Sequence, residues 1–299
     1  MKNKPIVKKT QAAHRLIERY WPFIFPLVLI LSLLTICPLV YMFYLSFRSW
    51  VITLPGSNVF VGMDNFIHLF HDYRCWNSIK VTTYIAGTPI VIQMFLGVAL
   101  ALALHRNLKG FGMCKVLFVT PMIIPPVVVG LIWKVMFIPQ VGSVNYFLDL
   151  LGLVGPDWLN RTDTAVWAII IAAVWEWTPF VVITVLAGLE ALPLEPFEAA
   201  KIDGASSMQI FTYVTFPLLK PILAVIFLFR IIESLGVLPL IFMMTDGGPA
   251  SATETINYYA FKLFNYYEIS YSSSIIVVIF LTIVALSWYF MQVATRTTK

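Results

Sequence analysis

The stretch FIFPLVLILSLLTICPLVYMFYLSF, residues 23–47, runs without one charged side chain. The hydrocarbon core of a bilayer is about 30 Å thick, and a helix needs about 20 apolar residues to cross it. The stretch is too long for the core of a signal peptide, and the large residues Tyr44, Phe47 and Trp50 stand where a cleavage site needs small ones. It therefore predicts a retained transmembrane helix.

Five more stretches meet the same length rule. Two have no charge and three contain one or two: residues 81–104, 272–294, 116–138 (Lys134), 165–189 (Glu176) and 221–244 (Arg230 and Glu233). Within lipid, every backbone N–H and C=O must find a partner inside the protein, which favours helices. The sequence therefore predicts an all-α integral membrane protein with six transmembrane helices.

The composition agrees with a membrane protein. Hydrophobic residues make up 60% of the chain and charged residues only 12%, whereas soluble domains carry about 25% charge. The excess apolar surface is expected to face lipid. The cysteines Cys37, Cys75 and Cys114 are spread along the chain, so we expect no structural disulfide.

The basic residues indicate which side of the membrane each connection faces, because Lys and Arg concentrate on the cytoplasmic side. Most of the 20 Lys and Arg fall in the two tails and in the second-to-third and fourth-to-fifth connections. We therefore expect both termini to be cytoplasmic, with tails at 1–20 and 296–299 and the transmembrane domain at 21–295. The net charge of +5 follows from this sorting and does not indicate a nucleic-acid partner.

The inner connection at 190–220 is more than a simple loop. Pro193 and Pro196 interrupt the preceding helix, residues 198–203 favour a short helix, and Gly204 stops it. Ser206 with Gln209 has the spacing of a capping box, which predicts a second short helix that ends at Pro217. By its shape, this helix–Gly–helix hairpin could simply join two spans, or it could dock a cytoplasmic partner.

Specific residues of the hairpin resemble the EAA loop of binding-protein-dependent ABC import permeases. That family has Glu-Ala-Ala, three residues, Gly, nine residues and Ile-x-Leu-Pro; this chain has Glu198-Ala199-Ala200, Gly204 and Val214-Thr215-Phe216-Pro217 at the same spacing. Over about residues 21–294 the chain is similar to the carbohydrate-uptake branch, which includes maltose- and trehalose-type permeases. The similarity is carried by segments such as 175–180, 187–189, 230–235 and 245–249. The branch often has Phe-Asp where this chain has Leu238-Pro239.

The resemblance implies a multi-pass subunit of the cytoplasmic (inner) membrane of a bacterium or archaeon, and not an enzyme. Its implied partners are a second, different permease subunit, two ABC ATPase subunits and an extracytoplasmic binding protein. The hairpin would form coupling helices that dock on an ATPase through Glu198, Ala199, Ala200, Asp203, Gly204 and Pro217. The chain has no phosphate-binding loop of its own, so ATP would act on the partner and the chain would carry no cofactor.

Ionisable residues inside a span are costly and usually face the bundle interior. Glu176, Arg230 and Glu233 all fall near mid-membrane, and Arg230 and Glu233 share one helix face. They could form an internal ion pair or triad that locks spans four and five together, or they could line a path for the substrate. Trp175, Trp177 and Ser234 complete the candidate path, whereas Lys134 is expected to snorkel to the interface.

Other functions are less well supported by the residues. An ion-gradient-driven secondary transporter could use Glu176, Arg230 and Glu233 but leaves the Glu-Ala-Ala pattern unexplained. An intramembrane enzyme lacks a paired catalytic motif, and the four histidines suggest no metal site. The identity of the cargo stays open: a disaccharide, an oligosaccharide, a polyol and a glycerol phosphate all fit.

Overall fold

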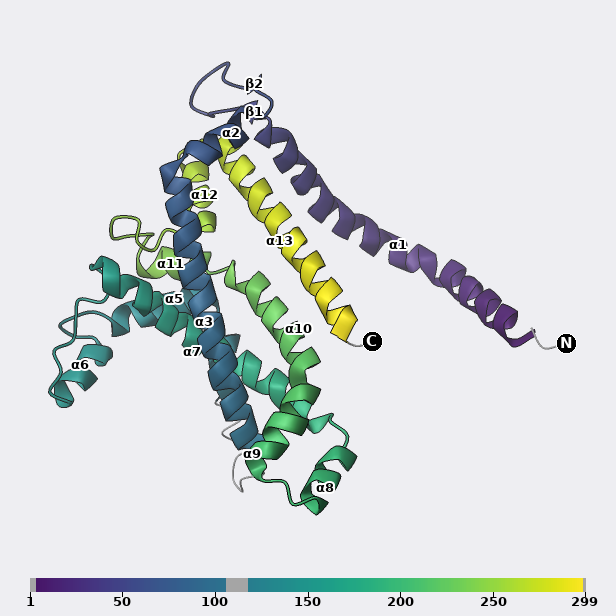
Figure 1. Ribbon diagram of the computed structural model, residues 1–299. Coiled ribbons are helices and arrows are strands. Elements are labelled where there is room, and N and C mark those ends of the chain that lie inside the picture. Colours follow the sequence, from purple (N-terminus) through teal and green to yellow (C-terminus); the bar gives the residue numbers. More distant parts are fainter. Residues whose placement is uncertain (1–3, 106–117, 298–299) are drawn as a thin grey trace.

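The computed structural model describes residues 4–105 and 118–297, and these are almost entirely helical (Figure 1). Within this part of the chain, five helices are long and apolar enough to cross a membrane. They correspond to the first, second, fourth and sixth predicted spans and to the first part of the fifth: α1 (Lys4–Ser46), α3 (Tyr73–His105), α7 (Thr162–Glu190), α13 (Ile269–Thr297) and α10 (Phe216–Ser234). Helix α1 also takes in most of the predicted N-terminal tail. Its internal prolines, Pro22, Pro26 and Pro38, do not end it.

The third predicted span, 116–138, is not one continuous helix. Residues 116 and 117 lie outside the described residues, 118–123 are helical, and α5 (Pro126–Met136) begins after a break. Pro125 has an extended backbone, with φ −56° and ψ 136°. A residue that precedes a proline is pushed out of the helical region, so the Pro125-Pro126 pair divides this span.

The fifth predicted span, 221–244, is also divided. Helix α10 ends at Ser234, and α11 (Leu238–Met244) begins after a three-residue break. Pro239 stands in the first turn of α11, where its missing N–H costs nothing. A single helix through this span was the wrong expectation, and the break places the backbone of Gly236 beside the ionisable residues of α10.

The connections predicted to be outer carry short elements of their own. A two-residue antiparallel ribbon joins β1 (Arg48–Ser49) to β2 (Val59–Phe60), followed by α2 (Asp64–His71), and α6 (Ser143–Leu150) follows α5. Between α11 and α13, α12 (Ile256–Asn265) buries five of its side chains against α3 and α13: Ile256, Tyr258, Tyr259, Ala260 and Leu263. The outer connection at 245–271 is thus part of the core.

The predicted inner hairpin consists of α8 (Glu195–Ile202) and α9 (Ser207–Ile210), and α9 continues through a π-helical turn, η1 (Phe211–Thr215), directly into α10. Gly204 joins the two helices with φ +76°, a conformation that favours glycine. The capping box is present, since Ser206 and Gln209 exchange hydrogen bonds. The expected stop at Pro217 is wrong, because a proline in the first turn after η1 does not end a helix.

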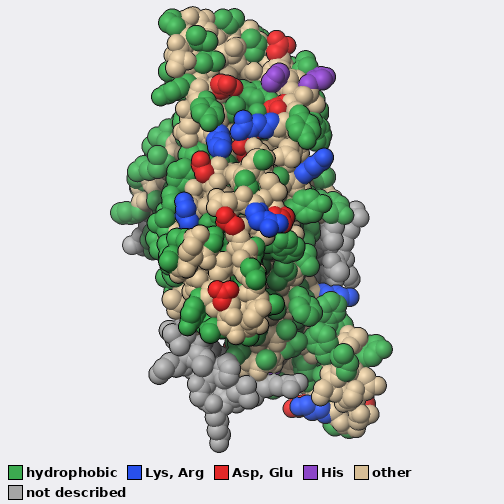
Figure 2. Space-filling model, turned by 90° about the vertical axis from the view of Figure 1, so that its left-hand side faces the viewer, with side chains coloured by type: hydrophobic (Ala, Val, Ile, Leu, Met, Phe, Trp, Pro, Cys, Tyr) green, Lys and Arg blue, Asp and Glu red, His purple; other side chains and the backbone are tan. Residues whose placement is uncertain are grey.

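Helices α3 and α7 form the centre of the bundle, and α10 packs on both. A Cβ on Gly97 of α3 would lie 2.5 Å from Val181 of α7, so the glycine permits their close approach. Helix α1, in contrast, meets α13 near its upper end and then diverges from it (Figure 1). Figure 2 shows basic and acidic side chains along the middle of one face, with hydrophobic side chains on either side.

Candidate functional site

Five of the six predicted path residues surround one cavity of about 80 Å³. Its walls come from α3, α5, α7, α10 and the start of α11, and the five residues are Glu176, Trp177, Arg230, Glu233 and Ser234. Helix α7 supplies the first two and the last turn of α10 supplies the others. Two segments far apart in the sequence thus direct their ionisable groups to one place.

Trp175 does not belong to this cavity. A helix turns about 100° per residue, so side chains two positions apart point to nearly opposite sides. Trp175 is 38% exposed and packs edge-on against Trp133 of α5, with 5.9 Å between ring centroids. It lines a separate apolar depression with Trp167.

Arg230 is only 2% exposed and is fixed from two sides. Its Nε donates a hydrogen bond of 3.1 Å to Oε1 of Gln93, and its guanidinium carbon lies 4.3 Å from the ring centroid of Trp177. A guanidinium over an indole face is a favourable cation–π geometry. Its Nη1 is buried and has no hydrogen-bond partner among the described residues.

Gln93 is a site residue that sequence reasoning missed. It is completely buried on α3, and its Nε2 donates to the carbonyl oxygen of Ala173 on α7 at 2.8 Å. Through Arg230 it also reaches α10, so one side chain joins three helices. The available signal was that Gln93 is the one amide in the apolar run 81–104, and polar side chains in spans often bond between helices.

The two carboxylates of the cavity are not paired with Arg230 at contact distance. Glu176 is 4% exposed and Glu233 is half-buried. In the part of the chain that the structure describes, no nitrogen of Arg230 lies within 4.0 Å of an oxygen of either acid. At Arg230, spans four and five meet through the ring of Trp177 and, by way of Gln93, the backbone of Ala173, and no contact ion pair is seen there among the described residues.

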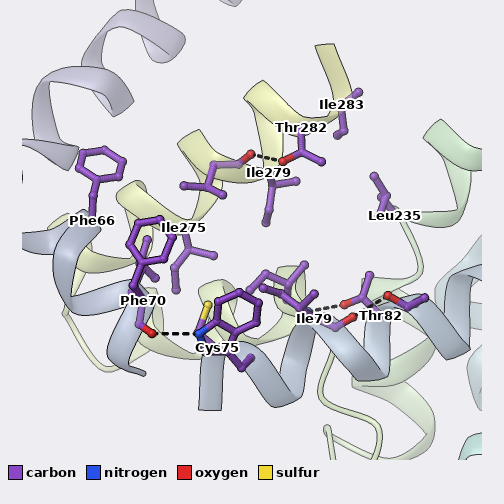
Figure 3. Close-up of a pocket in the computed structure, with 15 residues that line it drawn as sticks. Phe66, Phe70, Cys75, Ile79, Thr82, Leu235, Ile275, Ile279, Thr282 and Ile283 are labelled. Carbon is purple, nitrogen blue, oxygen red and sulfur yellow. Dashed lines mark hydrogen bonds between the residues drawn. The ribbon is translucent and has the colours of Figure 1, made fainter. Parts of the chain in front are cut away.

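A larger cavity of about 320 Å³ lies between α2, α3 and α13, with Ile256 of α12 also in its wall (Figure 3). Apolar side chains from all three helices line it, and none of the predicted path residues is among them. Its threonine hydroxyls are already engaged: Thr82, Thr83 and Thr282 each donate to a carbonyl of their own helix. Among the described residues, its lining includes no carboxylate and no guanidinium, unlike that of the smaller cavity.

The predicted coupling residues lie on the surface of the inner hairpin. Glu198, Ala199, Asp203, Gly204 and Pro217 are exposed, Ala200 is half-buried, and α8 has no buried residue. Large apolar side chains are exposed beside them: Leu194, Ile202 (86%), Met208 and Tyr213. Clustered exposed apolar residues indicate an interaction surface. A hollow of about 320 Å³, lined by Ala200, Asp203, Gly204 and their neighbours, separates the two helices.

Helix α10 connects the hairpin to the cavity without interruption. It follows α9 and η1 at the lower end of the molecule and rises to the break before α11 (Figure 1). Arg230 and Glu233 stand in its last turns. A displacement of the hairpin therefore has a direct route to the ionisable groups.

Near the β1–β2 end, the segment that leads into α12 is joined to the start of α3 by an ion pair whose carboxylate is buried. Arg74 donates from Nε and Nη2 to the two oxygens of Glu254, each at 2.7 Å, and Glu254 is fully buried. Nζ of Lys262 lies 3.7 Å from the same carboxylate. Bidentate arginine–carboxylate pairs are among the stronger polar contacts in proteins.

Asp72 adds a second connection on this side. Its Oδ2 accepts hydrogen bonds of 2.7 Å from Tyr259 of α12 and Tyr271 of α13. Burial raises the pKa of Asp72, but the hydrogen bonds from the two tyrosines and from backbone amides outweigh it and hold the pKa below the ordinary value of 3.8.

Residues 93–297 match the family of binding-protein-dependent transport system inner membrane components. The chain is 33% identical over 270 residues to the trehalose/maltose transport system permease protein MalF of Thermococcus litoralis, covering 90% of this chain and 91% of the relative. It is 31% identical over 256 residues to the sulfoquinovosyl glycerol transport system permease protein SmoG of Agrobacterium fabrum, covering 85% and 83%.

The fold is also that of a solved transporter. A bacterial ABC transporter involved in the import of the acidic polysaccharide alginate contains a chain with a TM-score of 0.81 and 21% identity, covering 96% of this chain and all of that one. The predicted all-α membrane fold and importer class are thereby confirmed, and the role is that of a permease subunit and not of an enzyme. The chain belongs to the family of binding-protein-dependent transport system inner membrane components.

Proposed function

We propose that this permease moves a sugar or a related polyhydroxy compound, and that the cavity around Arg230 is part of its path. The observation that carries the proposal is the convergence of Glu176, Trp177, Arg230, Glu233 and Ser234 on one cavity. The transport systems named for trehalose, maltose and sulfoquinovosyl glycerol among the relatives support the cargo class.

The chemistry of the cavity suits hydroxyl groups. A hydroxyl both donates and accepts hydrogen bonds, a carboxylate accepts, and a guanidinium donates. Arg230 Nη1 is a buried donor without a partner among the described residues, and the two acids are not paired with it. Neighbouring hydroxyls of a polyol could satisfy both kinds of group at once.

The cavity is too small to hold a whole sugar molecule. Its volume is about 80 Å³, whereas small-molecule sites usually enclose about 300–1,000 Å³. We therefore propose that a second permease subunit, of different sequence, supplies the facing wall. An extracytoplasmic binding protein would deliver the cargo, in keeping with the name of the family.

The exposed hairpin supports a docking role for an ATPase. Its polar surface includes uncovered apolar residues, and α10 connects it to the cavity. Two ATPase subunits would act on the hairpins of the two permeases. This arrangement requires the hairpin and both termini to be cytoplasmic, and it is supported by α1 and α13, whose terminal ends both point away from the β1–β2 end (Figure 1).

The test is uptake of radiolabelled maltose and trehalose by proteoliposomes that contain the importer with its neighbouring subunits and binding protein. Uptake should require ATP on the ATPase side and should persist after ionophores collapse all ion gradients. Uptake that stops with the ion gradient while ATP is held constant would contradict the proposal and favour a secondary carrier. Impermeant labelling of Ser207→Cys from the outside of intact cells would contradict the orientation.

A further inference from the structure

The Arg230 guanidinium is held so that one edge is left for a ligand. Gln93 binds its Nε and Trp177 covers its face. Gln93 is itself anchored to the backbone of Ala173. The uncommitted Nη1 belongs to a residue that is 2% exposed, and it has no hydrogen-bond partner in the described ranges. A buried donor without a partner is costly, so its presence at a cavity points to a ligand that accepts from it.

The charges around this donor set the kind of ligand that fits. Glu176, Arg230 and Glu233 are the ionisable groups among the described residues that line the cavity. In their ionised forms, the two carboxylates and the one guanidinium leave one negative charge in excess. Since neither acid lies within 4.0 Å of Arg230, contact pairing does not neutralise them.

A hydroxyl and an anionic group meet this arrangement differently. A hydroxyl can accept from Arg230 and donate to Glu233, so it can satisfy both. A sulfonate, phosphate or carboxylate can only accept, and it faces two like charges in a site with little water to screen them. The named relatives leave the charge of the cargo open, because sulfoquinovosyl glycerol is acidic and trehalose and maltose are not.

We propose that the cavity selects uncharged polyhydroxy cargo against anionic cargo, with Gln93 as the positioning residue that keeps the Arg230 donor turned toward the cargo. This inference rests on the proposed function, since it assigns a charge class to cargo in the same cavity. Glu176 and Glu233 repel anions, and Gln93 holds the Arg230 guanidinium in the orientation that presents its free donor to the cargo.

The field in the cavity can be measured with a cysteine reporter. Ser234→Cys is introduced after Cys37, Cys75 and Cys114 are replaced by alanine, and the purified importer without binding protein is treated with three methanethiosulfonates that are neutral (methyl), anionic (sulfonatoethyl) or cationic (aminoethyl). Each forms a mixed disulfide with the thiol and releases a sulfinate. Rates are divided by those of the same protein in denaturant. Val237→Cys provides a second reporter that also lines the cavity.

We expect the anionic reagent to react about tenfold more slowly than the neutral one, and the cationic reagent to show no deficit. Glu233→Gln should bring the rate of the anionic reagent most of the way back to that of the neutral one. Equal normalised rates for all three reagents at both reporters would overturn the inference. Maltose at high concentration should slow labelling; failure of maltose to protect while the charge deficit persists would contradict the proposed cargo and support the charge selection.

Two variants of Gln93 test its role. Gln93→Met removes the acceptor for Arg230, so protection by maltose should be lost. Gln93→Glu keeps an acceptor of the same length for Arg230 and adds a charge, although it loses the donor to the Ala173 carbonyl, so protection should be retained in part and the anionic reagent should react still more slowly. A merely structural role predicts equal damage from both substitutions, and that result would overturn the positioning assignment.

Discussion

The two ends of α10 are built in opposite ways. At the upper end, Arg230 is buried and held by Gln93 and Trp177, so its position is set by three helices. At the lower end, the hairpin of α8 and α9 has an exposed surface, and α8 buries nothing within the chain. Under the proposed function, the group that recognises the cargo is fixed in advance, whereas the surface that docks the ATPase is left uncovered.

This comparison, with the connections at the β1–β2 end as a reference, separates three kinds of mutational effect. Substitutions at the hairpin should leave the chain folded and abolish ATP-dependent uptake by the importer. Substitutions at the cavity should change which molecules pass and how readily. Substitutions in the outer connections should change stability and leave both of these properties nearly intact.

The largest effect is expected for Gly204→Asp. Gly204 has φ +76° and open space around its Cβ position, so the change disturbs the backbone turn and the surface and does not create a clash. ATP-dependent maltose uptake should fall to background with normal membrane insertion. The matched control is Gly152→Asp, at an outer glycine with φ +73° and equally open surroundings. Equal losses in both variants would count against a special role for the hairpin.

The next effect is expected for Arg230→Lys. Lysine keeps the charge but cannot donate to Gln93, stack on Trp177 and present a free edge at the same time. Maltose uptake should fall by about tenfold or more, because that is the factor expected from the loss of one hydrogen bond to a charged group. Trp175→Phe is the control, because Trp175 lies outside the cavity. Uptake that is unchanged in Arg230→Lys would remove Arg230 from the path.

A smaller effect, on stability alone, is expected for Arg74→Met. It leaves Glu254 buried with only Lys262, at 3.7 Å. Loss of one partner of a buried pair costs about 3–5 kcal/mol, and because the Arg74 side chain is 44% exposed we expect about 2 kcal/mol. Thermal unfolding in detergent measures it. Arg161→Met, which breaks an exposed pair with Asp163, should leave the melting temperature unchanged.

The smallest effect is expected at Asp72. Its pKa is lower in the folded protein than the ordinary 3.8, so it stabilises the fold above pH 3.8 and this stabilisation is lost as the pH falls toward the folded pKa. The melting temperatures of the wild type and Asp72→Asn should therefore converge between about pH 5 and about pH 3. A constant difference over that range would show that Asp72 acts without its charge.

The sequence predicted the class of fold because the length of an apolar run is a sufficient sign of a membrane span. The same rule missed the breaks at Pro125-Pro126 and before Leu238, since it counts apolar residues and does not test whether one helix can contain them. The burial of α12 was also missed. Its apolar side chains find partners on α3 and α13, which no local pattern identifies.

The candidate path was predicted in part. A charge within a span is costly wherever it points, so Glu176, Arg230 and Glu233 could be identified from sequence alone. Gln93 stands out as the one amide of its apolar run, but its partners could not be identified, because Ala173 and Arg230 lie 80 and 137 residues away in the sequence. Trp175 and Trp177 differ only in the side of α7 that they occupy, and the sequence does not show which side faces α10.

The divergence of α1 from α13 affects how this subunit meets its surroundings. None of the most apolar part of α1 is buried within the chain, and the two helices enclose a wedge that opens toward their free ends (Figure 1). The perimeter of the subunit is therefore longer than that of a compact bundle with the same number of helices. A detergent shell around the isolated chain must fill this wedge, and in the bilayer lipid or a neighbouring chain must fill it.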